Sequence, residues 1–197
     1  MSLFNFFKHK KKASENESKM PSIEQQEFSD AAVEIFTPVL VSKGFSLTKN
    51  EVEKYFTHIT FRKGTQYIKI IGDTWPTSYP WGFNVILGEG DSETFLEYDW
   101  NSIGLWQLKL RTDPSAKETN YGFRYDGKVI LDHLIQAKDD LLKYGNSFLH
   151  GDLTLFLETR KSINQQRDPY RISYVDENGD RQITHDEESL EKKKKYS

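Results

Sequence analysis

The chain has 197 residues, enough for one domain with short tails, and it contains no cysteine. The lack of thiols excludes a disulfide framework, a thiolate nucleophile and a cysteine-based metal centre, and it fits a reducing compartment. The formal net charge is −3, but eight lysines lie in two runs within residues 8–12 and 192–195, which leaves a net charge of −11 elsewhere. Such an acidic body repels nucleic acid, so we expect no nucleic-acid partner and favour a basic one.

Residues 1–21 are predicted to form a disordered basic tail, because this polar, lysine-rich segment lacks apolar periodicity. No run approaches the roughly 20 apolar residues that cross a bilayer, so we expect no stable membrane insertion. The first apolar residues precede the first lysines, the reverse of the order in a secretory signal. We therefore expect a cytoplasmic protein.

The first helix is predicted between Ser22 and Gly44. Ser22 and Gln25 have the spacing of a capping box, and apolar residues then recur at helical intervals. Gly44 is a typical residue just after a helix end. Pro38 lies inside the pattern and should kink the helix or split it in two.

Alternating apolar residues after Gly44 predict an antiparallel sheet. The predicted strands are residues 45–49, 55–62, 65–71, 82–87, 94–100 and 105–110. Helical spacing returns at 129–144 and again after Asp152. A helix, then strands, then helices indicates an α+β fold, a mostly antiparallel sheet with N-terminal and C-terminal helices packed on it. The single domain is expected to span residues 22–185, and residues 186–197 to form a charged C-terminal tail.

The segment from Asp176 to Glu187 has two interpretations. Its carboxylates and amides follow the template of a calcium loop, although Arg181 stands where that template has glycine. Alternatively, Asn178-Gly179 lies between two alternating segments, which is the strongest short signal for a β-hairpin. We predict a C-terminal hairpin without a bound metal.

The stretch from Ile70 to Leu108 contains no lysine or arginine, yet it holds six acidic residues and all four tryptophans. Aromatic rings beside carboxylates suit a cationic partner, through ion pairs and cation–π contacts. Several of the rings fall in a loop whose prolines cannot join a sheet ladder, so we expect these rings to be partly exposed. The predicted partner-binding residues are Trp75, Tyr79, Trp81, Glu89, Asp91, Glu93, Glu97 and Asp99. The alternative is an ordinary core and rim, with Trp100 and Trp106 buried and the acids solvated.

Motifs of catalysis are missing from the sequence. The five histidines are scattered and do not have the spacing of a helical metal site. There is no nucleophile elbow, phosphate-binding glycine loop or dinucleotide fingerprint. We expect no enzyme activity, no catalytic residues, no metal and no cofactor.

Short segments share a pattern: Leu40 before Lys43-Gly44-Phe45, apolar positions at Phe56, Ile59 and Phe61, and the stretch Lys143–Leu149. This pattern resembles small bacterial cytosolic domains, some of which are encoded beside polymorphic toxins as immunity proteins. The resemblance implies a helix that ends at a Lys-Gly-Phe corner and feeds an antiparallel sheet. It also implies a binding protein without catalytic chemistry.

We therefore expect a non-enzymatic binding protein of the immunity type that recognises a basic protein through its acidic, aromatic surface. Two alternatives remain open. A domain that binds a small ligand predicts that the same aromatic residues line a concave pocket. An enzyme of unrecognised type predicts carboxylates or histidines with perturbed pKa values inside that pocket.

Overall fold

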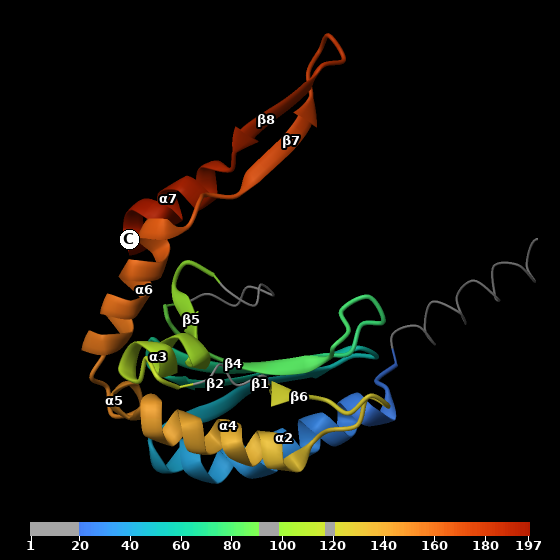
Figure 1. Cartoon of the computed structure of the whole chain (residues 1–197), viewed down its shortest axis with the longest axis vertical. Coiled ribbons are helices and arrows are strands. Elements are labelled where there is room, and N and C mark those ends of the chain that lie inside the picture. Colours follow the sequence, from blue (N-terminus) through green and yellow to red (C-terminus); the bar gives the residue numbers. More distant parts are fainter. Residues whose placement is uncertain (1–19, 91–98, 117–120) are drawn as a thin grey trace, which may run out of the picture.

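The computed structural model describes residues 20–90, 99–116 and 121–197 (Figure 1). The helices are α2 (Ile23–Ser42), α3 (Leu105–Thr112), α4 (Leu131–Tyr144), α5 (Asn146–Leu149), α6 (Thr154–Gln166) and α7 (Glu187–Tyr196). The strands are β1 (Ser46–Val52), β2 (Phe56–Lys63), β3 (Gln66–Asp73), β4 (Gly82–Glu89), β5 (Ser102–Gly104), β6 (Tyr121–Gly122), β7 (Arg171–Val175) and β8 (Arg181–His185). This is the predicted α+β fold. None of the helices in the described ranges is both long and apolar enough to cross a bilayer.

Helix α2 begins and ends where the sequence predicts. The Ser22 hydroxyl accepts a hydrogen bond from the backbone N–H of Gln25 at 3.1 Å. At the other end Gly44 has a φ of 84°, and the N–H of Phe45 bonds back to the carbonyl of Leu40. This is a Schellman ending. The helix continues through Pro38, so of the two predicted outcomes, a kink or a split, the split is wrong.

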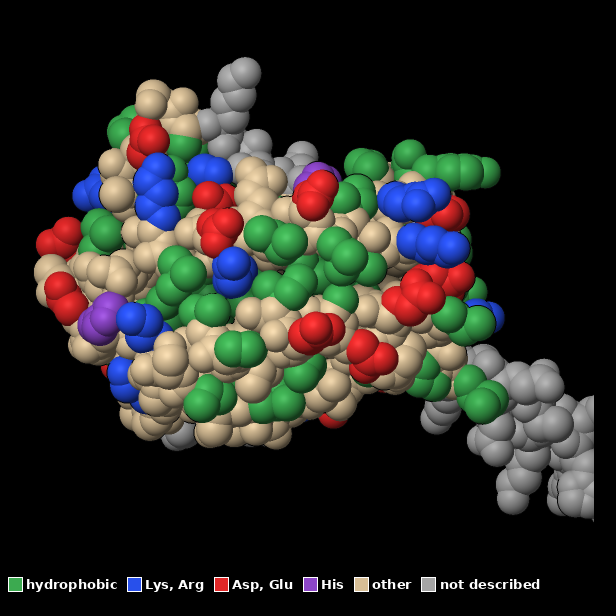
Figure 2. Space-filling view, turned by 90° about the horizontal axis from the view of Figure 1, so that it is seen from below, with side chains coloured by type: hydrophobic (Ala, Val, Ile, Leu, Met, Phe, Trp, Pro, Cys, Tyr) green, Lys and Arg blue, Asp and Glu red, His purple; other side chains and the backbone are tan. Residues whose placement is uncertain are grey.

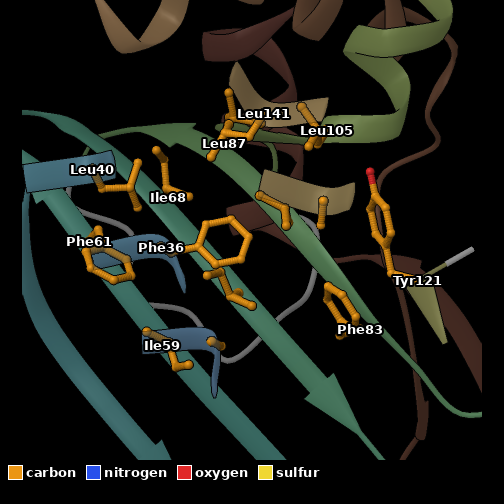
Figure 3. Close-up of a cluster of buried hydrophobic side chains, with 14 of the residues drawn as sticks. Phe36, Leu40, Ile59, Phe61, Ile68, Phe83, Leu87, Leu105, Tyr121 and Leu141 are labelled. Carbon is orange, nitrogen blue, oxygen red and sulfur yellow. The ribbon is translucent and has the colours of Figure 1, made fainter. Parts of the chain in front are cut away.

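The main sheet has the strand order β1-β2-β3-β4-β5, with antiparallel neighbours throughout, and β6 pairs with the start of β4. Helices α2 and α4 lie together against one face of this sheet (Figure 1). Between the helices and the sheet is the main hydrophobic core, where Phe36 and Leu40 point toward Ile59, Phe61 and Ile68 (Figure 3).

Two predicted segments differ from the structure. Residues 105–110 form part of helix α3, not a strand, and Leu105 and Leu108 are buried at a spacing of one helical turn. A short apolar run does not distinguish a helix from a strand. The expected tail at 186–197 instead contains helix α7, capped by Asp186, which accepts from the N–H of Ser189 at 2.8 Å. Of the strand predicted at 94–100, residues 94–98 lie outside the described residues.

The predicted C-terminal hairpin is confirmed. Strands β7 and β8 pair across a turn in which Gly179 has a φ of 87°, and all ten strand residues are exposed. The hairpin projects away from the rest of the chain (Figure 1). One oxygen of Asp176 accepts from the N–H groups of Asn178 and Asp180, and the other accepts from Gln182. The chain's own donors therefore occupy the first carboxylate of the calcium template, and the absence of calcium stays a prediction.

The Phe28 ring on α2 packs so closely against β3 that only glycine fits at position 72. A methyl group at Gly72 would lie 2.4 Å from the Phe28 ring. We expect Gly72→Ala to lower the free energy of unfolding by about 1–3 kcal/mol, measured by urea denaturation. The matched variant is Phe28→Leu, which makes room for the methyl group. The double variant should lose less stability than the sum of the two single losses, and strict additivity would contradict this close contact.

Candidate functional site

A cavity of about 750 Å³ lies at one end of the main sheet, where β2 begins, β3 ends and β4 begins. The loop between β3 and β4, residues 74–81, forms one side of it and stands up from the sheet face opposite α2 and α4 (Figure 1). The cavity is lined by Phe56, Ile71, Asp73, Trp75, Ser78, Pro80, Trp81, Gly82, Phe83, Asn84, Tyr121, Gly122 and Phe123. Six of these residues are aromatic, and Asp73 is the one charged residue among them.

Strand register explains why residues far apart in sequence meet at this cavity. Phe56 pairs with Asp73, Asp73 with Gly82, and Gly82 with Gly122. Directly opposed residues in an antiparallel sheet lie on the same face, so this row places a ring and a carboxylate side by side.

Two hydrogen bonds, one to the backbone of the loop and one to the Asp73 side chain, hold the two tryptophan residues in place. The indole N–H of Trp81 donates to the carbonyl of Trp75 at 2.7 Å, and the backbone N–H of Trp75 donates to Asp73 at 2.9 Å. The Trp75 ring lies 5.0 Å from that of Tyr55, and Tyr79 lies 5.6 Å from Trp81. Trp75 is 43% exposed, Tyr79 is 63% exposed and Trp81 is half-buried, which confirms the expected accessibility of the loop aromatics.

Tyr121 borders the cavity at β6, but its ring points to the helical side of the sheet. Its ring stacks on Phe83 at 5.2 Å, and both rings face the core (Figure 3). Its hydroxyl donates to Asp140 at 2.7 Å, and Lys109 pairs with the same carboxylate at 2.9 Å. Burial, with the hydrogen bond to Asp140, raises the pKa of Tyr121, so the phenol stays protonated.

The predicted acids do not gather at the loop aromatics. Glu89 ends β4, seven residues beyond Gly82, which places it about 23 Å from the cavity end of the strand. It pairs there with Arg160 at 3.3 Å. Asp99 is 3% exposed and pairs with Lys192 at 3.4 Å. Asp91, Glu93 and Glu97 lie outside the described residues. On the helical face, the acidic side chains are interspersed with basic and hydrophobic ones (Figure 2).

Of the other two tryptophans, Trp100 is fully buried, as the core alternative expects, and Trp106 is half-buried. The acid that does join the aromatic loop is Asp73. Sequence reasoning counted it in the lysine-free stretch but did not select it. The signal was its position, directly between a buried strand and the Trp-Pro loop. Phe56 and Tyr121 carried no such signal, because only the strand register brings them to the cavity.

A buried polar group, His58, lies beside the cavity but is not part of its wall. It sits opposite Ile71, is 1% exposed, and its Nε2 lies 3.1 Å from the Thr60 hydroxyl. Its Nδ1 has no hydrogen-bond partner in the described part of the chain. Burial, followed by the positive charges of Lys69 and Lys49, lowers the pKa of His58 to about 4. The imidazole is therefore neutral at physiological pH.

No group of three or more side chains able to ligate a metal occurs among the described residues. No family model matches the chain, and no curated protein or solved structure is significantly similar to it. The resemblance to immunity-type domains stays a prediction, and any functional proposal depends on the geometry of the cavity.

His58 makes the stability of the fold depend on pH. Its pKa is about 4 in the folded chain and 6.5 in its ordinary state, so the unfolded chain takes up a proton first. The free energy of unfolding should therefore fall as the pH drops through the window from 6.5 to 4. Urea denaturation across this window measures the effect. His58→Gln should flatten the dependence and the exposed control His185→Gln should not; equal slopes in all three proteins would contradict the assignment.

Proposed function

We propose that this chain is a non-enzymatic, cytoplasmic binding protein, and that the cavity under the β3–β4 loop is its ligand site. The observation that carries the proposal is a cavity of about 750 Å³ with six aromatic residues in its lining. Pockets for small organic ligands commonly measure about 300–1,000 Å³ and are mainly apolar and aromatic. Aromatic walls favour a ligand with a flat or compact apolar part, which can stack on the rings.

Preorganisation supports binding at this cavity. Trp81 ties the two ends of the loop through the carbonyl of Trp75, and Asp73 fixes the N–H of Trp75. A site whose walls are already held in place loses less conformational entropy when a ligand enters.

The polar chemistry of the wall favours binding over catalysis. Its polar side chains include Asp73, Ser78 and Asn84, and no described lining residue is a histidine. The group with the strongly lowered pKa, His58, lies outside the wall. General acid–base catalysis requires such a group within hydrogen-bond reach of the substrate. The absence of cysteine supports a reducing, cytoplasmic setting.

A basic protein partner, as expected for the immunity type, is the second candidate. It is favoured by the exposure of Tyr79 and Trp75 at the rim of the cavity. Exposed tyrosine and tryptophan side chains often dominate the binding energy of protein interfaces.

The first test uses N-phenyl-1-naphthylamine, a neutral aromatic dye that fluoresces when it leaves water. The wild-type chain should give a saturable rise in fluorescence. Trp81→Ala should weaken binding by about tenfold or more, because a buried ring at a binding centre contributes on the order of 2 kcal/mol. Trp75→Ala, which removes a more exposed ring, is a second variant in case Trp81→Ala does not fold. Circular dichroism would reveal a folding defect in either variant.

Tyr174→Ala is the matched control, because Tyr174 is 51% exposed but lies on the projecting hairpin. It should bind the dye like the wild type. Absence of saturable binding in the wild type would overturn the proposal, and so would an equal loss of affinity in the control.

A further inference from the structure

Asp73 is a carboxylate whose binding capacity is largely unused. It is half-buried at the end of β3, and one of its oxygens accepts the N–H of Trp75 at 2.9 Å. Among the described residues it forms no ion pair. An ionised carboxylate can accept about four hydrogen bonds. Its second oxygen is thus available to a cationic group that enters the cavity.

The aromatic rings near Asp73 also favour a positively charged ligand. The hydrogen bond from Trp75 to Asp73 joins that tryptophan to the carboxylate, and the bond from Trp81 to Trp75 fixes the second tryptophan. Both indoles contribute to the cavity wall. The faces of aromatic rings carry negative electrostatic potential, and tryptophan attracts cations most strongly. No lysine or arginine is among the described lining residues.

An occupant without a positive charge is less well matched to this wall. A neutral apolar group would partly desolvate the Asp73 carboxylate without pairing it, which costs free energy. An anionic group would face both the carboxylate and the ring faces. A quaternary or protonated amine satisfies both features at once, through an ion pair with Asp73 and cation–π contacts with Trp75 and Trp81.

We infer that the aromatic cavity is selective for a ligand with a compact organic cation, either a quaternary ammonium or a protonated amine group. This inference rests on the proposed function and names the ligand class of that site. Asp73 supplies the counter-charge, and the tryptophans supply the cage around the cation.

The test compares choline with 3,3-dimethylbutan-1-ol, in which a carbon atom replaces the charged nitrogen and the shape is unchanged. Each is titrated against the protein with the bound neutral dye as reporter. Choline should displace the dye at a concentration about tenfold or more lower than the alcohol, the ratio expected from one cation–π contact and one partly buried ion pair. Asp73→Asn should reduce this preference, because it removes the ion pair and keeps the cation–π contact.

Glu177→Gln is the control for the loss of one negative charge, since Glu177 is an exposed residue at the hairpin turn. It should keep the preference for choline. If choline and the alcohol displace the dye equally, or if Asp73→Asn keeps the full preference of the wild type, the cation inference is wrong while the ligand site stands. If the wild type fails to bind the dye at all, the proposed function fails first.

Discussion

The contact between Phe28 and Gly72 is the constraint on which the rest of the structure depends. It brings helix α2 so close to β3 that a side chain on the strand has no room. This approach sets the height of the helix above the sheet. One turn earlier on the helix, the buried Gln25 side chain donates to Thr74 at 2.9 Å and accepts from Thr57 at 2.6 Å. Since Thr74 directly follows β3, the position of the helix also fixes where the aromatic loop begins.

The buried Gln25 also explains why only half of the capping box forms. Ser22 caps the helix as expected, but the Gln25 side chain turns into the protein instead of back to the helix start. A buried amide with two hydroxyl partners satisfies polar groups that the sheet would otherwise leave unpaired. A local sequence rule predicted the helix start correctly, and a long-range contact determined what the second residue of the motif does.

Much of the fold was predictable, because strong local signals determine it. Helical spacing located α2 and α4, and Asn178-Gly179 located the hairpin between β7 and β8. The strand predicted at 105–110 was wrong because a run of six residues does not separate the helical period from the strand period. The segment after residue 186 was predicted to be a tail because it is rich in lysine. The contacts that hold α7 are long-range and leave no signal in the sequence, such as the bond from Asn164 to the Tyr196 carbonyl at 3.0 Å.

The site was only partly predictable. The lysine-free stretch and its prolines pointed correctly to an accessible loop at Trp75, Tyr79 and Trp81. The predicted acids were chosen because they are close to the loop in the sequence. Glu89 is nevertheless far from the loop in space, because β4 runs away from it. Asp73 and Phe56 meet in the cavity through strand register, which one sequence does not reveal.

The projecting hairpin has a mechanical consequence for the chain. It is inserted between α6 and α7, and both of these helices are attached to the body: Asn164 on α6 donates to the Trp100 carbonyl at 2.7 Å, and Lys192 on α7 pairs with Asp99. A two-stranded ribbon in water is only marginally stable by itself, so its backbone opens more readily than that of the main sheet. Among the described strands, a protease would therefore cut these two first, near Asn178-Gly179. The two fragments would remain associated, because the contacts of α6 and α7 on either side of the cut do not depend on the ribbon.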